Sequence, residues 1–85
     1  MYTFYFENKR VEKKVEYYRI IRKDIAFKLE RLKLDPRKAL DAHPLSGKLY
    51  GLWSCWLVSN IRMLYTLDDI EIKIIVHAVG THKIY

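Results

Sequence analysis

The sequence predicts an α+β fold in which a small antiparallel β-sheet packs against a helical hairpin on one face. A first segment, Tyr2–Phe6, has the alternating residue pattern of a β-strand and is rich in β-favouring residues. Residues 9–34 carry apolar side chains at helical spacing, and residues 53–77 form three strand-like runs separated by short turns. The expected order is β-α-α-β-β-β. With 85 residues, the chain is sized for one domain, residues 1–85.

The helical segment is expected to begin after Asn8, a good helix cap, and to end before Pro36. One continuous helix over residues 9–34 would be roughly 39 Å long at about 1.5 Å per residue. A compact chain of this length has a radius of gyration of only ~12 Å. We therefore expect a break between residues 17 and 24. The buried stripe is marked by Val11, Val15, Tyr18, Ile21, Ile25, Leu29 and Leu32.

Three strands are expected after an irregular connection over residues 36–51. They are Trp53–Val58, Ile61–Leu67 and Ile70–His77, joined by turns at residues 59–60 and 68–69. Connections this short predict an antiparallel meander.

Two-residue turns would set the register and the two faces of this sheet. Arg62 would then pair with Leu57 on one side and with Ile75 on the other. The helices would cover the more apolar face, which holds Trp56, Ile61, Met63, Tyr65, Ile70, Ile72, Ile74 and Val76. The other face would hold Arg62 with Trp53, Cys55, Leu64, Lys73 and His77. A slip of one residue would invert the assignment.

The net charge is +6, and most of it lies in the first half of the chain. Residues 1–42 hold 12 Lys/Arg against 7 Asp/Glu, whereas residues 43–85 hold 4 against 3. A basic surface attracts polyanions, although a solvated helix surface has the same composition. No apolar run is long enough to span a membrane, and the first residues lack the pattern of a signal peptide. With one cysteine, Cys55, and no disulfide to form, a cytoplasmic location is expected.

Metal and cofactor chemistry are poorly supported by the sequence. The three histidines, His43, His77 and His82, form no HxxxH or HExxH pair, and the three glycines match no phosphate-binding loop. Cys55 lies in a strand between tryptophans, which favours packing over nucleophilic catalysis. We therefore expect neither a metal nor a cofactor.

The remaining polar residues suit the cleavage of RNA, whose 2′-hydroxyl is an internal nucleophile. The reaction needs a base, an acid and a cation for the phosphate, and histidine and arginine supply these near neutral pH. Each residue also has a structural alternative. His43 could shape the loop before Pro44, His77 could be a half-buried strand residue with satisfied hydrogen bonds, and Arg62 could bridge to Asp68 or Glu71.

Three motifs of the second half resemble the RelE/ParE superfamily of type II toxin–antitoxin toxins, especially its YafQ-like and YoeB-like branch. They are HPLSGKL with GLWS from residue 43 to residue 54, NIRMLY from residue 60 to residue 65, and GTH from residue 80 to residue 82. The resemblance implies a curved antiparallel sheet with a helical hairpin on one face. It also implies cleavage of mRNA, typically in the ribosomal A site, and inhibition by a cognate antitoxin.

The resemblance also implies roles for individual residues. His43 matches a general base or substrate-positioning residue, and Arg62 matches an arginine that stabilises charge on the phosphate. His82 matches a general acid or base, and Tyr85 lies near the terminal aromatic that stacks on a base. The expected RNA-binding residues are Lys48, Lys73 and Lys83.

The sequence departs from the YafQ-like pattern in two places. Trp56 and Asn60 stand where those toxins have histidine and aspartate, and only three residues follow His82 instead of four. Two alternatives therefore stay open: a ParE-like toxin that binds DNA gyrase without cutting RNA, and a degenerate member that binds RNA or an antitoxin. The two histidines and Arg62 favour the nuclease, because a gyrase binder needs no acid–base pair.

Overall fold

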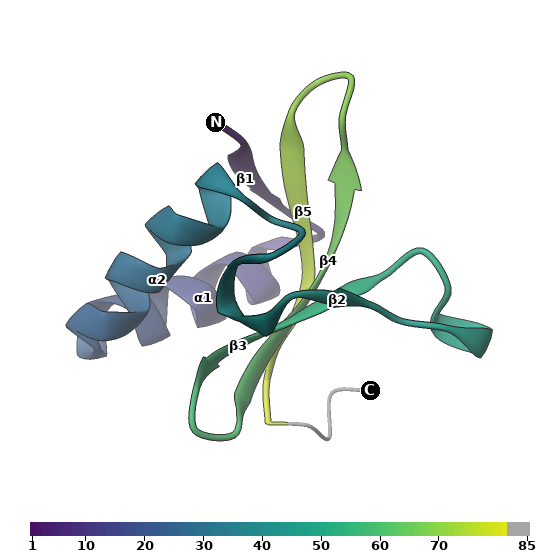
Figure 1. Ribbon diagram of the computed structural model, residues 1–85. Helices are drawn as coiled ribbons and strands as arrows, with labels where there is room; N and C mark the ends of the chain where they lie inside the picture. Colours follow the sequence, from purple (N-terminus) through teal and green to yellow (C-terminus); the bar gives the residue numbers. More distant parts are fainter. Residues whose placement is uncertain (82–85) are drawn as a thin grey trace.

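The fold is α+β, with both helices on one side of a five-stranded sheet (Figure 1). The computed structural model describes residues 1–81. The elements are β1 (Thr3–Phe6), α1 (Lys9–Ile21), α2 (Lys23–Leu34), the 3₁₀ turn η1 (Ala39–Asp41), β2 (His43–Pro44), the 3₁₀ turn η2 (Gly47–Leu49), β3 (Trp53–Val58), β4 (Ile61–Asp68) and β5 (Lys73–Gly80). The predicted fold class is confirmed. The segment predicted as irregular contains one further short strand, β2.

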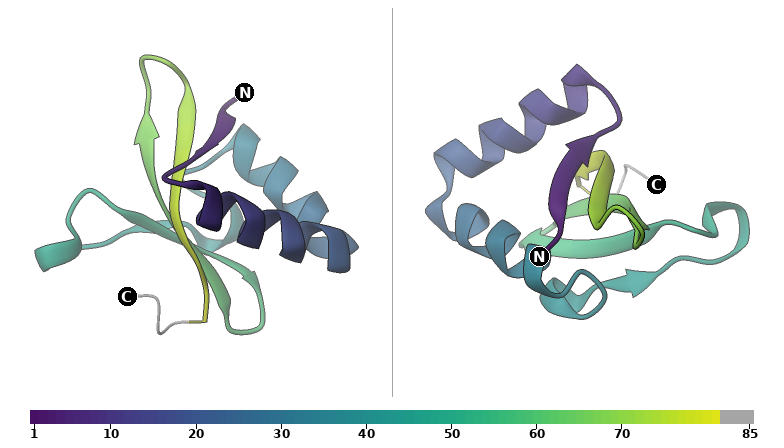
Figure 2. Two further views of the ribbon diagram at one scale, coloured as in Figure 1. Left: turned by 180° about the vertical axis from the view of Figure 1, so that it is seen from behind. Right: turned by 90° about the horizontal axis from the view of Figure 1, so that it is seen from above.

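The strand order across the sheet is β1-β5-β4-β3-β2. β1 is parallel to β5, and the other neighbouring pairs are antiparallel, so the sheet is mixed. A parallel pair requires a long crossover connection, which the helices and the strands after them provide between β1 and β5. Both helices lie on the same face in each view (Figure 2), with α1 packed against β5 and α2 against β3.

The helical segment breaks at Arg22, inside the predicted interval. Arg22 has extended backbone angles (φ −134°, ψ 110°) and caps both α1 and α2. Its guanidinium donates to both carboxylate oxygens of Asp24, at 3.1 and 2.8 Å, which holds the turn without glycine or proline. Asn8 caps α1 as predicted, accepting from the backbone N–H of Val11 at 3.0 Å. Neither helix in the described chain is long and apolar enough to cross a membrane.

The register between β3 and β4 differs from the prediction. The turn at residues 59–60 is present, but an irregularity between Trp56 and Val58 shifts the pairing. Arg62 therefore faces Trp56 instead of Leu57. Side chains of a strand alternate between the two faces of the sheet. A shift of one residue therefore moves each neighbouring β3 side chain to the face opposite the predicted one.

The connection between β4 and β5 is longer than predicted. β4 continues to Asp68 and β5 begins at Lys73, so Ile70 lies in the turn and is 94% exposed. A carboxylate oxygen of Asp68 accepts from the backbone N–H groups of Ile70 and Glu71, at 3.0 Å each, which stabilises the turn. A second irregularity, opposite Leu64, moves the pairing further along, and Arg62 faces Gly80 instead of Ile75.

The core lies between the helices and the covered face of the sheet. It contains the predicted Met63, Tyr65, Ile74 and Val76, with Ile61 packed against it, but the predictions for Ile21, Trp53, Cys55, Trp56, Ile70 and Ile72 are wrong. Ile21, Ile70 and Ile72 were expected in the core and are exposed. Cys55 is fully buried in the core, and Trp56 lies on the opposite face and is 44% exposed. Helix residues Val15, Ile25, Leu29 and Leu32 complete the cluster with Leu57 and Val79. Trp53, which was assigned to the other face, also packs against it.

Candidate functional site

The face of the sheet away from the helices, here termed the open face, carries Arg62 near the start of the central strand β4. Arg62 lies between Trp56 of β3 and Gly80 of β5 in one row of the sheet. Its guanidinium carbon is 5.0 Å from the centre of the Trp56 indole, a cation–π contact. Residues 80–82 form the GTH motif, so this motif begins directly beside Arg62.

His43 lies on the same face at the edge of the sheet. It faces Ser54, which in turn faces Leu64, two residues from Arg62. Ser54 and Leu64 are buried and lie between the two candidate side chains. With strands about 4.8 Å apart and a rise of about 3.3 Å per residue, the Cα atoms of His43 and Arg62 are about 12 Å apart. A single phosphodiester can be approached by both side chains over this span.

A hydrogen bond selects the tautomer of the neutral His43 ring. Its Nδ1 lies 3.0 Å from the backbone oxygen of Asp41. A carbonyl oxygen only accepts hydrogen bonds, so Nδ1 carries a proton. In the neutral ring, Nε2 then has the lone pair, and His43 is exposed at this edge. This is the tautomer that a general base directed away from the chain requires.

The other predicted site residues are distributed unevenly. Lys48 is exposed on η2, in the connection that extends away from the helices beyond β2 (Figure 1). Lys73 begins β5 and lies seven residues before Gly80, roughly 23 Å along the strand at about 3.3 Å per residue. The structure therefore does not bring Lys73 to Arg62. His82, Lys83 and Tyr85 lie outside the described residues.

His77 and Cys55, which the sequence analysis considered for catalysis, are both held by contacts within the fold. His77 is held at both ring nitrogens, with Nδ1 2.9 Å from a Glu7 carboxylate oxygen and Nε2 2.9 Å from the Thr66 hydroxyl. These contacts tie the end of β1 to β5 and β4. Burial raises the pKa of the Cys55 thiol to about 12, so it is not a thiolate near neutral pH. The prediction that Cys55 is a packing residue is confirmed.

Cations near the β4–β5 turn are paired with carboxylates. Arg37 donates to Asp69 at 2.7 Å and to the Tyr2 hydroxyl at 3.3 Å, and Tyr2 also donates to Asp69 at 2.7 Å. The hydrogen bond from Arg37 is the main reason why the pKa of Asp69 is below its ordinary value. Lys73 pairs with Glu71 at 3.1 Å and lies 4.4 Å from the Tyr5 ring centre. We term this group the paired end of the sheet.

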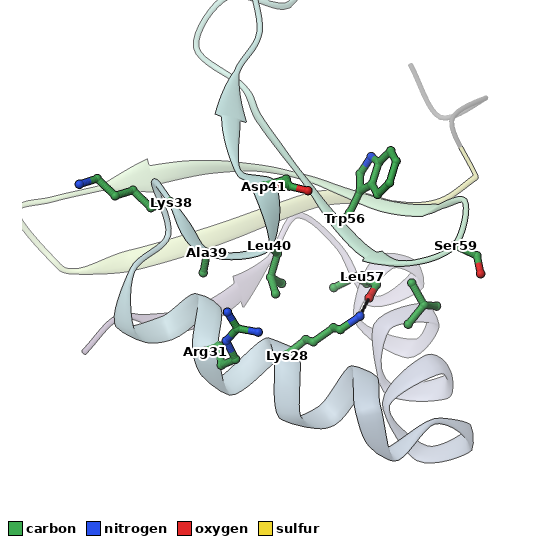
Figure 3. Close-up of a pocket in the computed structure, with 10 residues that line it drawn as sticks. Lys28, Arg31, Lys38, Ala39, Leu40, Asp41, Trp56, Leu57 and Ser59 are labelled. Carbon is green, nitrogen blue, oxygen red and sulfur yellow. Dashed lines mark hydrogen bonds between the residues drawn. The ribbon is translucent and has the colours of Figure 1, made fainter.

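A second group of cations lines a hollow between α2, η1 and β3 (Figure 3). We term it the cationic pocket; its volume is about 380 Å³. Its walls are Lys28, Arg31, Lys38, Ala39, Leu40, Asp41, Trp56, Leu57, Val58 and Ser59. Lys28 donates to the backbone oxygen of Leu57 at 2.6 Å, which anchors α2 to the edge of β3. Figure 3 shows the Trp56 indole on the side of β3 away from α2.

The turn η1 connects the pocket to His43. Leu40 and Asp41 both have left-handed backbone angles, with φ of 58° and 55°. This conformation costs roughly 1–2 kcal/mol per residue for side chains other than glycine. Here it lets Leu40 pack against the core while the Asp41 backbone oxygen accepts from His43. The same two residues line the pocket, so its shape and the orientation of His43 depend on one turn.

Sequence reasoning missed the pocket. Lys28 and Arg31 are three residues apart on one helix, a spacing that places them on the same side and could have been noticed. Lys38 joins them only because η1 folds back, and Trp56 only because of the irregularity in β3. Among residues 1–81, no three His, Cys, Asp or Glu side chains are grouped so as to hold a metal ion.

The fold is shared with solved toxins and chains of toxin–antitoxin complexes, so the fold that the resemblance implied is confirmed. One similar chain comes from the toxin–antitoxin complex RelBE2 of Mycobacterium tuberculosis, at 23% identity, TM-score 0.73, and coverage of 95% of this chain and 98% of that one. The YoeB/ParE toxin from Agrobacterium tumefaciens has 18% identity, TM-score 0.74, and coverage of 96% and 99%. YafQ from E. coli has 14% identity, TM-score 0.67, and coverage of 99% and 97%. No protein-family model and no curated protein sequence matches the chain.

Proposed function

We propose that the protein is the toxin of a type II toxin–antitoxin system and acts as a metal-independent endoribonuclease on mRNA. The fold, shared with toxins and toxin–antitoxin complexes, supports the toxin assignment. The net charge of +6 supports a polyanionic substrate. In this proposal the mRNA is cut in the ribosomal A site in the cytoplasm, and a cognate antitoxin neutralises the toxin.

One observation carries the nuclease proposal. Arg62 lies half-buried on the face of the sheet away from the helices, in the row where β5 ends and the GTH motif begins. A guanidinium in that position can hold two phosphate oxygens and keeps its charge at every physiological pH. Had Arg62 been placed beneath the helices, a substrate could not have reached it.

The proposed reaction uses the 2′-hydroxyl of the RNA as the nucleophile. His43 Nε2 takes the 2′-proton, and the oxygen attacks the adjacent phosphorus while Arg62 stabilises the charge that develops on the phosphate. His82 gives a proton to the departing 5′-oxygen. The bond from phosphorus to that oxygen breaks, leaving a 2′,3′-cyclic phosphate and a 5′-hydroxyl. In this scheme Tyr85 stacks on a base, and Lys48 and Lys83 hold flanking phosphates.

The test is cleavage of mRNA by the purified protein in EDTA, with and without ribosomes. We expect cleavage with cyclic-phosphate ends by the wild type, and a rate at least about 100-fold lower for the His43→Ala/His82→Ala variant, the usual scale for acid–base groups. Absence of cleavage under both conditions would contradict the nuclease proposal. Wild-type rates from the double variant would contradict the assignment of the histidines.

A further inference from the structure

The cationic pocket concentrates positive charge without the carboxylates that neutralise it elsewhere. Lys28, Arg31 and Lys38 form no ion pair with any other residue in the described part of the chain. The one acidic side chain in the wall is Asp41, so the lining residues carry a net charge of +2 (three cations minus one carboxylate). Lys28 uses one of its three donors on Leu57, which leaves two.

Trp56 belongs to both this pocket and the Arg62 row. It lines the pocket and is 5.0 Å from the Arg62 guanidinium. The indole is 44% exposed, which is unusual for so large an aromatic ring on a sheet. Trp56 is therefore adjacent both to Arg62 and to the pocket, with its indole on the side of β3 away from α2 (Figure 3).

We propose that the cationic pocket binds a backbone phosphate of a single-stranded RNA whose neighbouring base stacks on Trp56. The strand would cross the open face at Arg62, pass Trp56 and turn over the edge of β3 into the pocket. This inference rests on the proposed nuclease function and extends it, because it assigns a binding site beside the cleaved phosphate to residues outside the recognised motifs.

The composition of the pocket favours RNA over an acidic protein segment. Positive grooves with an aromatic ring beside them are the usual way in which single strands are bound, since the phosphates need cations and the bases need flat surfaces. An acidic peptide would gain from the cations but has no base to place on Trp56. The volume of about 380 Å³ is large enough for a small polar group and its hydration.

The experiment measures binding of a short, fluorescently labelled single-stranded RNA that carries 2′-O-methyl groups and so cannot be cleaved. The pocket variant is Arg31→Gln/Lys38→Gln, since both side chains are exposed at the rim, while Lys28 is retained because it anchors β3. The matched control is Lys13→Gln/Lys23→Gln, which removes the same charge from exposed helix positions outside the pocket.

We expect the pocket variant to bind about tenfold more weakly than the control variant. The slope of log affinity against log salt concentration should fall by about 0.7 relative to the wild type, the value for one lost phosphate contact on a single strand. Equal affinities and equal slopes for the two variants would overturn the proposal. So would a wild-type protein that does not bind this RNA.

Two further measurements separate the remaining outcomes. In a Trp53→Phe background, Trp56 is the one tryptophan left, and its fluorescence should be quenched in parallel with RNA binding.

Polyglutamate is the competing probe: if the pocket variant loses affinity for polyglutamate but not for RNA, the pocket binds acidic protein and the proposal is wrong. Cleavage by the wild type together with equal binding by both variants would refute this inference alone, whereas absence of cleavage would refute the nuclease function.

Discussion

The two ends of the sheet carry similar cations in different surroundings. At the paired end, Arg37 contacts Asp69, and Lys73 contacts Glu71. At the opposite end, Arg62 contacts the Trp56 indole, and the cations of the adjoining pocket have no carboxylate partner within residues 1–81. A carboxylate partner stabilises a cationic side chain but also neutralises its charge, so that the cation attracts an incoming anion less strongly. The comparison therefore separates cations that support the fold from cations that can bind a polyanion.

Arg37 and Lys38 show that this separation is made residue by residue. They are adjacent in the sequence, and both follow α2. Arg37 turns to Asp69 and Tyr2, whereas Lys38 lines the cationic pocket. Net charge alone could not have distinguished them, because each counts as one positive charge.

The largest effect is expected from comparing two histidines. His43→Ala should lower the rate of RNA cleavage by at least about 100-fold, because Nε2 is the proposed base. His77→Ala should leave the rate of the folded protein unchanged, since both of its ring nitrogens are held by Glu7 and Thr66. Single-turnover rates with urea unfolding curves provide the measurement. A larger loss of rate in His77→Ala than in His43→Ala would reverse the assignment.

The fold could be predicted to the level of elements, but not to the level of register. The break near Arg22 follows from the limit that compactness sets on one long helix, and the turn at residues 59–60 from the spacing of the strands. The two irregularities in β3 and opposite Leu64 leave no mark in the alternation of apolar residues. Ile70 and Ile72 continue that alternation although they lie in a turn, because the carboxylate of Asp68 caps the backbone there.

A smaller effect is expected from comparing two lysines predicted to bind RNA. Lys48 is exposed on η2 beyond His43, so Lys48→Gln should lower the salt slope of RNA binding by about 0.7, as for one lost phosphate contact. Lys73 is paired with Glu71 at 3.1 Å, so Lys73→Gln should leave the slope unchanged. Titrations at several salt concentrations test both. Equal slopes for the two variants would mean that the ends of the sheet do not differ in RNA binding.

The smallest effect concerns stability at the paired end. The Arg37 guanidinium, followed by the Tyr2 hydroxyl, holds the pKa of Asp69 below its ordinary value of 3.8. A carboxyl whose pKa is lowered by folding stabilises the protein above its unfolded pKa, and this contribution disappears as the pH falls through the folded pKa. The free energy of unfolding should therefore differ between wild type and Asp69→Asn near neutral pH and converge in acid. A difference that persists in acid would show that Asp69 acts through packing instead.

The candidate site could be predicted where a motif fixes it and not where packing does. Arg62 and His43 were proposed because they match motif positions, and both lie on the open face. Lys73 was grouped with Arg62 because a two-residue turn was assumed, and the longer turn separates them. The cationic pocket combines α2, η1 and β3, so no stretch of sequence contains it.

The most direct test of the account is the rate of mRNA cleavage by Arg62→Ala, measured together with its free energy of unfolding. The account predicts a fall in rate of at least about 100-fold, the usual loss when a transition-state charge loses its hydrogen-bond donor. It also predicts that this fall persists in the folded fraction of the variant, although half-buried Arg62 also stabilises the fold through its contact with Trp56. A loss of activity that is fully explained by unfolding would contradict it and make Arg62 a structural residue.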